Sequence, residues 1–307
     1  MTRKMFSLSA FVALMFVLTA LVFTSCEKAI FSDYETSGET DGNLRVRVFQ
    51  IENTPFGNLT RAIGNEQLTR GATTASEVCT RLNFLIYNTD GSRAKMVNQT
   101  SDNAGFGTAS FQLDEGDYQL VVVGHSANGN PTSTNPQKIS FTNAQGYTDT
   151  FLSSGDITIE PEESLEIDVT LERIVARCSF VITDEFPAEV AKLQFYYTGG
   201  SGAFDAYTGL GSVNSKQTVT FDVTDGSQTQ FDLYTFLHEQ SDNIALRVTA
   251  LDANGNTLYE REFDVPMEQN HITWLTGAFF NGSGSSSTSV TGVTVNTDWA
   301  GETRLSF

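Results

Sequence analysis

The stretch LEIDVTLERIVARCSFVI, residues 165–182, decides the fold that the sequence predicts. Apolar and polar residues alternate through its first seven positions, which is the pattern of a strand with one buried face. From Ile174 onward the apolar residues fall on even positions instead. A shift of one residue turns every side chain to the opposite face, so one strand cannot serve a single core over this length. A β-bulge near Glu172 and Arg173 would explain the shift, but we favour a chain that leaves one core here and enters another.

Length and composition are those of an all-β protein with two domains. The chain has 307 residues with 23 Phe, 9 Tyr and 25 Gly, and few stretches show helical periodicity. Short strands separated by turn signals are typical of a β-sandwich. Division at the change of phase therefore predicts an N-terminal β-sandwich over residues 42–172 and a C-terminal β-sandwich over residues 173–307.

The expected strands follow from alternation and from turn residues. In the first half they occupy residues 44–51, 80–87, 108–113, 118–123, 156–160 and 165–171. The motif Thr89-Asp90-Gly91 predicts a turn after the second of them, and residues 114–117, Asp-Glu-Gly-Asp, predict a hairpin between the third and the fourth. In the second half we expect strands at residues 190–197, 217–223, 230–237, 245–251, 257–265, 270–280, 290–296 and 304–307.

The N-terminus has the features of a lipoprotein signal peptide. Residues 1–25 begin with two basic residues, continue as an apolar run and end in Thr24-Ser25 before Cys26. A Cys at the first mature position resembles a bacterial lipoprotein box, in which the thiol receives a diacylglycerol and the amine a further acyl chain such as palmitate. Residues 26–41 then form a polar tether. An ordinary secretory signal and an uncleaved anchor helix are the alternatives.

Charge and cysteine content limit the classes of partner. Loss of Arg3 and Lys4 with the signal peptide leaves 16 basic against 37 acidic residues, a net charge of −21. Such a surface repels nucleic acid, so no nucleic-acid partner is expected. Three cysteines are too few for a disulfide framework. If Cys26 is modified, Cys79 and Cys178 either pair with each other or remain free and buried.

No catalytic, cofactor-binding or metal site is evident, and we do not expect an enzyme. His125, His238 and His271 lie far apart in the sequence. The motif at residues 124–128 lacks the second glycine and the following helix of a nucleophile elbow, and residues 252–256 lack the spacing of a calcium loop. A pair of glycosidase carboxylates cannot be chosen among so many acidic residues. Both tryptophans, Trp274 and Trp299, lie on apolar stretches and are expected in the core.

Several motifs in order give the chain a resemblance to a known family. After Cys26 come YNTDGSRA at 87–94, GDYQLVVVG at 116–124, VTLERIVARCSFVI at 169–182, NHITWLTGAFF at 270–280 and VNTDW at 295–299. This order resembles the fimbrillin superfamily of donor-strand (type V) pili. It is most similar to the lipoprotein anchor or minor subunits of that superfamily, the FimB/Mfa-like family. The resemblance implies two tandem transthyretin-like, Greek-key β-sandwich domains.

The resemblance also implies a function. The protein would be a fimbrial subunit held in the outer membrane by lipid on Cys26, and it would join a fimbrillin by strand addition at the cell surface. Polymerising relatives lose their first strand to cleavage after an Arg, whereas anchor relatives keep it. Here the first strand would be residues 44–51, and the arginines of suitable type are Arg45, Arg47, Arg61 and Arg70. The alternatives are a stalk or tip adhesin subunit, a surface lipoprotein that binds a glycan or host protein without polymerising, and a secreted hydrolase.

The C-terminal segment has two interpretations. Residues 281–289, NGSGSSSTS, have the composition of a flexible loop and precede the expected strand at residues 290–296. That strand could act as a detachable donor strand, or it could return to the second sandwich above Trp299. Its alternation of Val with Thr and Asn suits a half-buried strand, so we favour the intramolecular arrangement.

Overall fold

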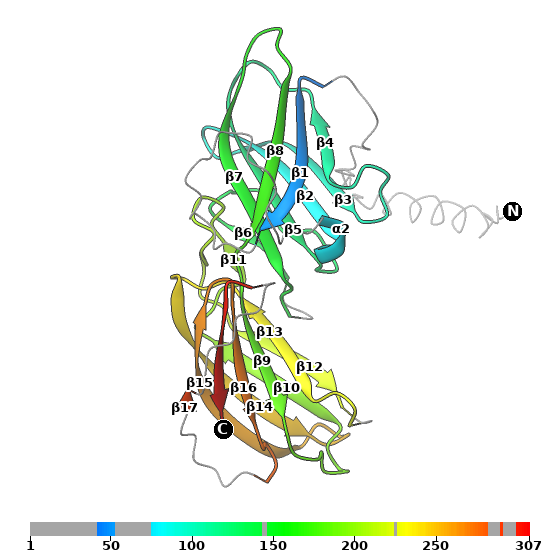
Figure 1. The fold of residues 1–307 in the computed structure, drawn as a ribbon, viewed down its shortest axis with the longest axis vertical. Helices are drawn as coiled ribbons and strands as arrows, with labels where there is room; N and C mark the ends of the chain where they lie inside the picture. The colour runs from blue at the N-terminus through cyan, green and yellow to red at the C-terminus, as the bar shows by residue number, and fades with distance from the viewer. Residues whose placement is uncertain (1–41, 53–74, 143–145, 224–225, 282–288, 291–298) are drawn as a thin grey trace, which may run out of the picture. The chain divides into compact units, whose positions relative to one another are not determined.

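A computed structural model describes residues 42–52, 75–142, 146–223, 226–281, 289–290 and 299–307 (Figure 1). The predicted signal peptide 1–25, Cys26 and the tether 26–41 lie outside the described residues, so these assignments remain predictions. Among the described residues the regular structure is β-strand, apart from the single helical turn α2 (Ala75–Val78). The predicted all-β fold is confirmed.

The first half of the chain forms one seven-stranded sheet that folds over on itself. Its order is β3-β2-β5-β7-β8-β1-β4. The strands are β1 (Leu44–Glu52), β2 (Arg81–Asn88), β3 (Arg93–Thr100), β4 (Thr108–Phe111), β5 (Gly116–His125), β7 (Thr150–Ile159) and β8 (Leu165–Arg173). β7 and β8 pair at only two positions, Phe151 with Arg173 and Leu152 with Glu172. The first core joins side chains of β2 and β5 to side chains of β1, β4 and β8, so the two parts of the sheet pack as the layers of a sandwich.

The structure corrects three of the expectations for this half. The predicted hairpin at residues 114–117 is wrong, because β4 pairs with β1 while β5 pairs with β2 and β7. Backbone bonds of Leu113 to the side chain of Asn43 draw the end of β4 toward the start of β1. β3 was not expected at all. It pairs with β2 as an antiparallel hairpin, and the turn of this hairpin is the predicted one at Thr89-Asp90-Gly91. β7 also begins at Thr150, six positions before the strand that alternation predicts.

The second half forms two sheets that enclose the second core. One sheet has the order β12-β10-β14-β15 and the other has the order β13-β9-β16-β18-β17 (Figure 1). The strands are β9 (Ala176–Ile182), β10 (Lys192–Thr198), β12 (Gln217–Asp222), β13 (Gln230–Thr235), β14 (Ser241–Leu251), β15 (Thr257–Glu268), β16 (His271–Gly277), β17 (Ser289–Val290) and β18 (Gly301–Ser306). Phe180 of β9 lies edge-on to Phe195 and Phe263 of the facing sheet, with ring centroids 5.4 and 5.5 Å apart. The expected hairpin of β14 and β15 is confirmed.

The change of hydrophobic phase coincides with a change of sheet. β8 places Val169 and Leu171 in the first core, and β9 places Cys178 and Phe180 in the second. The predicted change of core is therefore seen, although β8 ends at Arg173 and β9 begins at Ala176, so no single strand runs across. The domain limits 42–172 and 173–307 remain a prediction.

A third buried cluster explains why residues 84–87 of β2, Phe-Leu-Ile-Tyr, are apolar without alternation. Phe84 and Ile86 face the first core, whereas Leu85 and Tyr87 face this third cluster. The other members include Val121 and Val123 of β5, Ile174, Val175, Phe204, Phe236, Ile272 and Trp299. Phe204 belongs to the short strand β11 (Ala203–Phe204), which pairs with β6 (Ile139–Ser140). Strands buried on both faces lose the polar half of their alternation.

Arg173 is a buried cation at the edge of this third cluster. Only 5% of its side chain is exposed, and its guanidinium binds both carboxylate oxygens of Asp149, at 2.7 and 2.9 Å. A further N–H donates to Asn270 Oδ1 at 3.0 Å. The guanidinium carbon lies 3.9 Å from the ring centre of Trp299 and 4.8 Å from that of Phe151. The charge is thus neutralised by a bidentate partner and covered by two aromatic rings.

Candidate functional site

The first strand, β1, fills a groove between β8 and β4. It pairs in parallel with β8 from Leu44 to Glu52, and antiparallel with β4 over Leu44 to Arg47. Leu44, Val46 and Ile51 are buried in the first core. Complete burial of such side chains contributes about 2 kcal/mol each, before the backbone bonds to two neighbours are counted. Removal of β1 would open an apolar groove with two unpaired strand edges, which is the geometry of a strand-addition site.

Asn43 fastens the beginning of β1 at three points. Its side-chain amide donates to the carbonyl of Leu113 at 2.8 Å, and its side-chain oxygen accepts from the N–H of Leu113 at 2.9 Å. Its backbone carbonyl accepts from the N–H of Leu165 at 2.8 Å. The preceding Gly42 passes so close to Phe111 that a Cβ there would meet the carbonyl oxygen of Phe111. The entry to β1 is therefore fixed by residues 42–43, which the strand pattern did not single out.

The outer face of β1 is polar and paired with β8. Arg47 binds Asp168 through two hydrogen bonds of 2.8 and 2.6 Å, and Arg45 lies 3.8 Å from Glu166. The carboxylate of Asp168 raises the pKa of Arg47, first by hydrogen bonding and then by its charge. After Val48 the register shifts by one residue, and Phe49 occupies the bulge with 48% of its surface exposed.

The predicted cleavage and lipidation residues divide into two groups. Arg45 and Arg47 lie within the paired strand β1, where a protease that needs an extended free chain has no access to the backbone. Arg61, Arg70 and Cys26 lie outside the described residues. Lipidation of Cys26 and cleavage after Arg61 or Arg70 therefore remain predictions.

Cys79 and Cys178 are free thiols buried in different cores. The sequence left open whether these two cysteines form a disulfide or remain free, and in the structure they are free. Burial raises the pKa of each thiol to about 12, and the charges of Asp149 and Asp232 add to the effect at Cys79 and Cys178 respectively. Neither thiol is therefore a nucleophile at neutral pH.

His125 is a structural residue of the first half. Its ring is fully buried, and Nε2 lies 2.9 Å from Asn83 Oδ1 while Nδ1 accepts from the N–H of Ala127 at 3.1 Å. Burial lowers its pKa to about 3, with a smaller effect from the charge of Arg81, so the ring is neutral. The neighbouring Ser126 accepts a bond from the N–H of Thr80, and no helix follows it. The motif at residues 124–128 is thus a strand end and not a nucleophile elbow.

The other candidates for chemistry have structural partners. Asp252 accepts the N–H groups of Asn254 and Asn256 and closes the β14–β15 turn. Among the residues that the structure describes, no three His, Cys, Asp or Glu side chains gather as a metal site would require. Within the same residues no helix has the length and apolar content needed to cross a membrane. Trp299 is buried as expected, whereas Trp274 is only partly buried against the third cluster.

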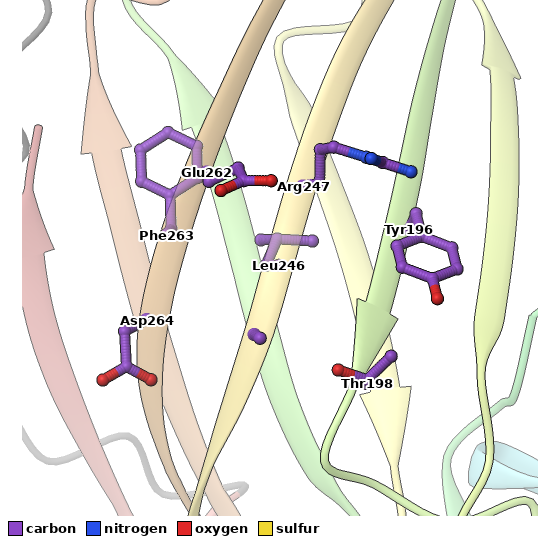
Figure 2. Close-up of a pocket in the computed structure, with 8 residues that line it drawn as sticks. Tyr196, Thr198, Leu246, Arg247, Glu262, Phe263 and Asp264 are labelled. Atoms are coloured by element: carbon purple, nitrogen blue, oxygen red, sulfur yellow. The ribbon is translucent and has the colours of Figure 1, made fainter.

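A shallow groove of about 380 Å³ lies on the outer face of the β12-β10-β14-β15 sheet (Figure 2). Tyr196, Arg247 and Glu262 stand in one cross-strand row, and Figure 2 shows the Arg247 side chain extending toward the Tyr196 ring. The guanidinium lies 4.9 Å from the centre of that ring, and its Nε lies 3.9 Å from Glu260. Arg247 is thus engaged by its neighbours, and the carboxylates of Glu262 and Asp264 make the rim acidic.

Comparison with known proteins assigns the chain to a family. One family model matches residues 41–306, from just before β1 to the end of β18. The chain belongs to DUF6562, a family of unknown function. The match covers both halves of this DUF6562 protein, including β1 and the strand β18 at its C-terminal end. No curated protein matches it.

Several solved structures have a partly similar fold. The fimbrial anchor protein Mfa2 of Porphyromonas gingivalis is 13% identical, with a TM-score of 0.40 over 71% of this chain and 80% of Mfa2. The tip fimbrial protein Mfa3 of the same species is 12% identical, with a TM-score of 0.36 over 73% and 80%. A candidate adhesin of Bacteroides ovatus is 18% identical, with a TM-score of 0.46 over 61% and 77%. The sequence predicts a resemblance to lipoprotein anchor or minor fimbrial subunits, and the structure is similar to a fimbrial anchor protein and a fimbrial tip protein; at these identities the similarity concerns the fold alone.

Proposed function

We propose that this DUF6562 protein is a lipid-anchored fimbrial subunit of the cell surface. It terminates or anchors the fibre at the outer membrane and joins a fimbrillin by strand addition. The role is structural and not catalytic. The observation that supports the proposal is the position of the first strand: in the full chain β1 occupies its own groove, fastened by Asn43 and by three buried side chains. A subunit whose groove is already filled cannot accept a donor strand there, which suits the end of a fibre.

The N-terminal sequence supports the membrane end of this proposal. Lipid on Cys26 would supply two or more acyl chains, and each buried methylene contributes about 0.8 kcal/mol to membrane binding. Two chains give stable anchoring where one chain is marginal. The polar tether at residues 26–41 would separate the sheet that begins at Leu44 from the bilayer.

Substitution of Cys26 in the native host tests the anchoring role. In cells that carry Cys26→Ser, we expect the protein and the attached fimbriae in the culture medium, while Ser32→Ala in the tether leaves both on the cells. Fractionation followed by immunoblotting of the protein and electron microscopy of the fibres gives the readout. Fibres that stay attached in Cys26→Ser cells would contradict an anchoring role and favour a stalk or tip subunit.

A further inference from the structure

A polar pocket of about 450 Å³ lies away from β1 and from the groove of Figure 2. Three segments line it: the β2–β3 turn at residues 89–92, the loop at residues 134–137, and Tyr207 in the loop that follows β11. Its volume lies in the range of ordinary ligand pockets. Most of its lining is polar, which is unusual for a site that would take an apolar molecule.

Tyr207 provides the aromatic surface of the pocket. With 51% exposure it is the most exposed large hydrophobic side chain among the described residues. The loop holds it there, because Asp205 Oδ1 accepts the N–H of Tyr207 at 2.8 Å and the backbone carbonyl of Asp205 accepts the N–H of Gly209 at 2.8 Å. The adjoining Ala206 donates to the carbonyl of Pro136 at 2.8 Å, which fixes this loop to the 134–137 loop. The ring is therefore displayed to solvent by a backbone that is already ordered.

Asp90, in the β2–β3 turn, provides a charged acceptor in the lining. Its Oδ1 accepts both the N–H and the hydroxyl of Ser92, at 2.8 and 2.6 Å. These bonds lower the pKa of Asp90, the hydroxyl bond having the larger effect, so the carboxylate is ionised at neutral pH. Both bonds go to Oδ1, so neither uses Oδ2. The turn is further closed by Gly91, whose φ of 82° suits glycine.

Neutral donors and acceptors complete the lining. Thr89, Thr134 and Gln137 are exposed, and no described residue forms a hydrogen bond with their side chains. Asn135 is exposed and uses its Oδ1 to accept the N–H of Gln137 at 2.9 Å. The pocket therefore offers hydroxyl, amide and carboxylate groups beside one exposed ring.

We propose that this pocket binds a neutral sugar unit of a glycan. A pyranose has one apolar C–H face, which would pack on the ring of Tyr207, and vicinal hydroxyls, which would donate to Asp90 and bond with Gln137 and the two threonines. The ordered turn and loops lower the entropy cost of binding. Asp90 and the net charge of the protein, −19 for the full sequence, disfavour sialylated or sulfated sugars.

Glycan binding by the full-length chain in detergent tests the proposal. An array of neutral and anionic glycans identifies a neutral ligand, and saturation-transfer NMR then measures its affinity. We expect Tyr207→Ala to weaken binding about tenfold through loss of the stacked ring, and Asp90→Asn to weaken it by about tenfold or more through loss of a charged acceptor. Asn at position 90 can still accept the bonds of Ser92, so the turn is preserved.

Two further variants separate a specific effect from a general one. Phe49→Ala removes a ring of similar exposure on β1, and we expect unchanged affinity. Tyr207→Leu keeps apolar volume without the ring and is expected to behave like Tyr207→Ala. Absence of any neutral ligand, binding of anionic glycans only, or full affinity in both Tyr207 variants would overturn the proposal. These results are independent of lipid on Cys26 and of fibre attachment, so the anchoring role stands or falls separately.

Discussion

Substitution of Arg173 by Met tests the role assigned to the buried cation beside the third cluster. Arg173→Met leaves the Asp149 carboxylate without its bidentate partner, and removal of one member of a buried ion pair costs about 3–5 kcal/mol. Because 23% of the Asp149 side chain remains exposed, water can solvate part of the charge and the lower end applies. The Met side chain replaces some of the contact with Trp299, which offsets part of the lost cation–π interaction. We therefore expect a loss of about 3 kcal/mol in the free energy of unfolding.

Urea unfolding followed by tryptophan fluorescence is the appropriate assay. The chain has only two tryptophans, and Trp299 lies 3.9 Å from the Arg173 guanidinium, so the signal reports on this region. A parallel measurement by circular dichroism shows whether the transitions coincide, which a two-state analysis requires.

Arg47→Met is the matched control. Arg47 binds Asp168 in the same bidentate manner, with bonds of 2.8 and 2.6 Å, but the two side chains are 57% and 49% exposed. Exposed ion pairs contribute little because water solvates both charges. We expect its unfolding midpoint to equal that of the wild type within error. Equal losses in the two variants, or a loss below about 1 kcal/mol for Arg173→Met, would refute the reasoning from burial.

Three other predictions follow from buried groups. The lowered pKa of His125, about 3 against 6.5 when unfolded, means that the unfolded chain binds an extra proton between these values. The free energy of unfolding should therefore fall as the pH falls below 6.5, and His125 should account for about 2 kcal/mol of that loss between pH 8 and pH 5. In urea titrations at these two pH values, His125→Gln should lack this part of the pH dependence. Cys79 and Cys178 should be inert to a thiol reagent in the native protein and react after unfolding, whereas rapid native labelling would contradict their burial. Deletion of residues 301–307 removes β18 and the ring of Phe307, which stacks on Phe180 with ring centroids 5.0 Å apart. We expect calorimetry to show no cooperative unfolding of the second core in this variant. An unchanged transition would show that β18 is dispensable.

Local patterns predicted much of the fold because most strands bury one face. The alternation in residues 165–171 and the shift after Arg173 located the change from the first core to the second. The turn at Thr89-Asp90-Gly91 and the β14–β15 hairpin were predicted because turn residues at both sites act locally. These features depend on neighbours within a few residues.

Features that depend on distant partners were missed. Nothing near Leu113 in the sequence shows that Asn43, 70 residues earlier, would bind its backbone and turn β4 toward β1. β3 lies at the edge of its sheet, where Val97 and Gln99 are buried, Lys95 is exposed and Arg93 is half-buried against Ser133, so its apolar signal is weak. Of the expected strand at residues 290–296, only Val290 is described, and it pairs with Leu305 of β18. Residues 291–296 lie outside the described residues, so the choice between a donor strand and an intramolecular strand remains a prediction.

The candidate sites were predictable to different degrees. The glycine and asparagine at residues 42–43 precede an alternating run, and such residues commonly mark the entry to a strand. In contrast, Tyr207 and Asp90 line one pocket because β11 pairs with β6 and Ala206 bonds to Pro136, which brings the 205–210 loop against the 134–137 loop. Pairing between segments more than 60 positions apart has no local signature.

The N-terminus of the native protein tests most directly whether the protein is a lipid-anchored subunit that keeps its first strand. Intact-mass analysis of the protein extracted from outer membranes should give a chain that begins at Cys26, carries the added mass of its lipid and retains β1 through to Phe307. A chain that begins after Arg45, Arg47, Arg61 or Arg70 would contradict both the retained first strand and the membrane anchor, and a chain that keeps Cys26 without lipid would contradict the membrane anchor.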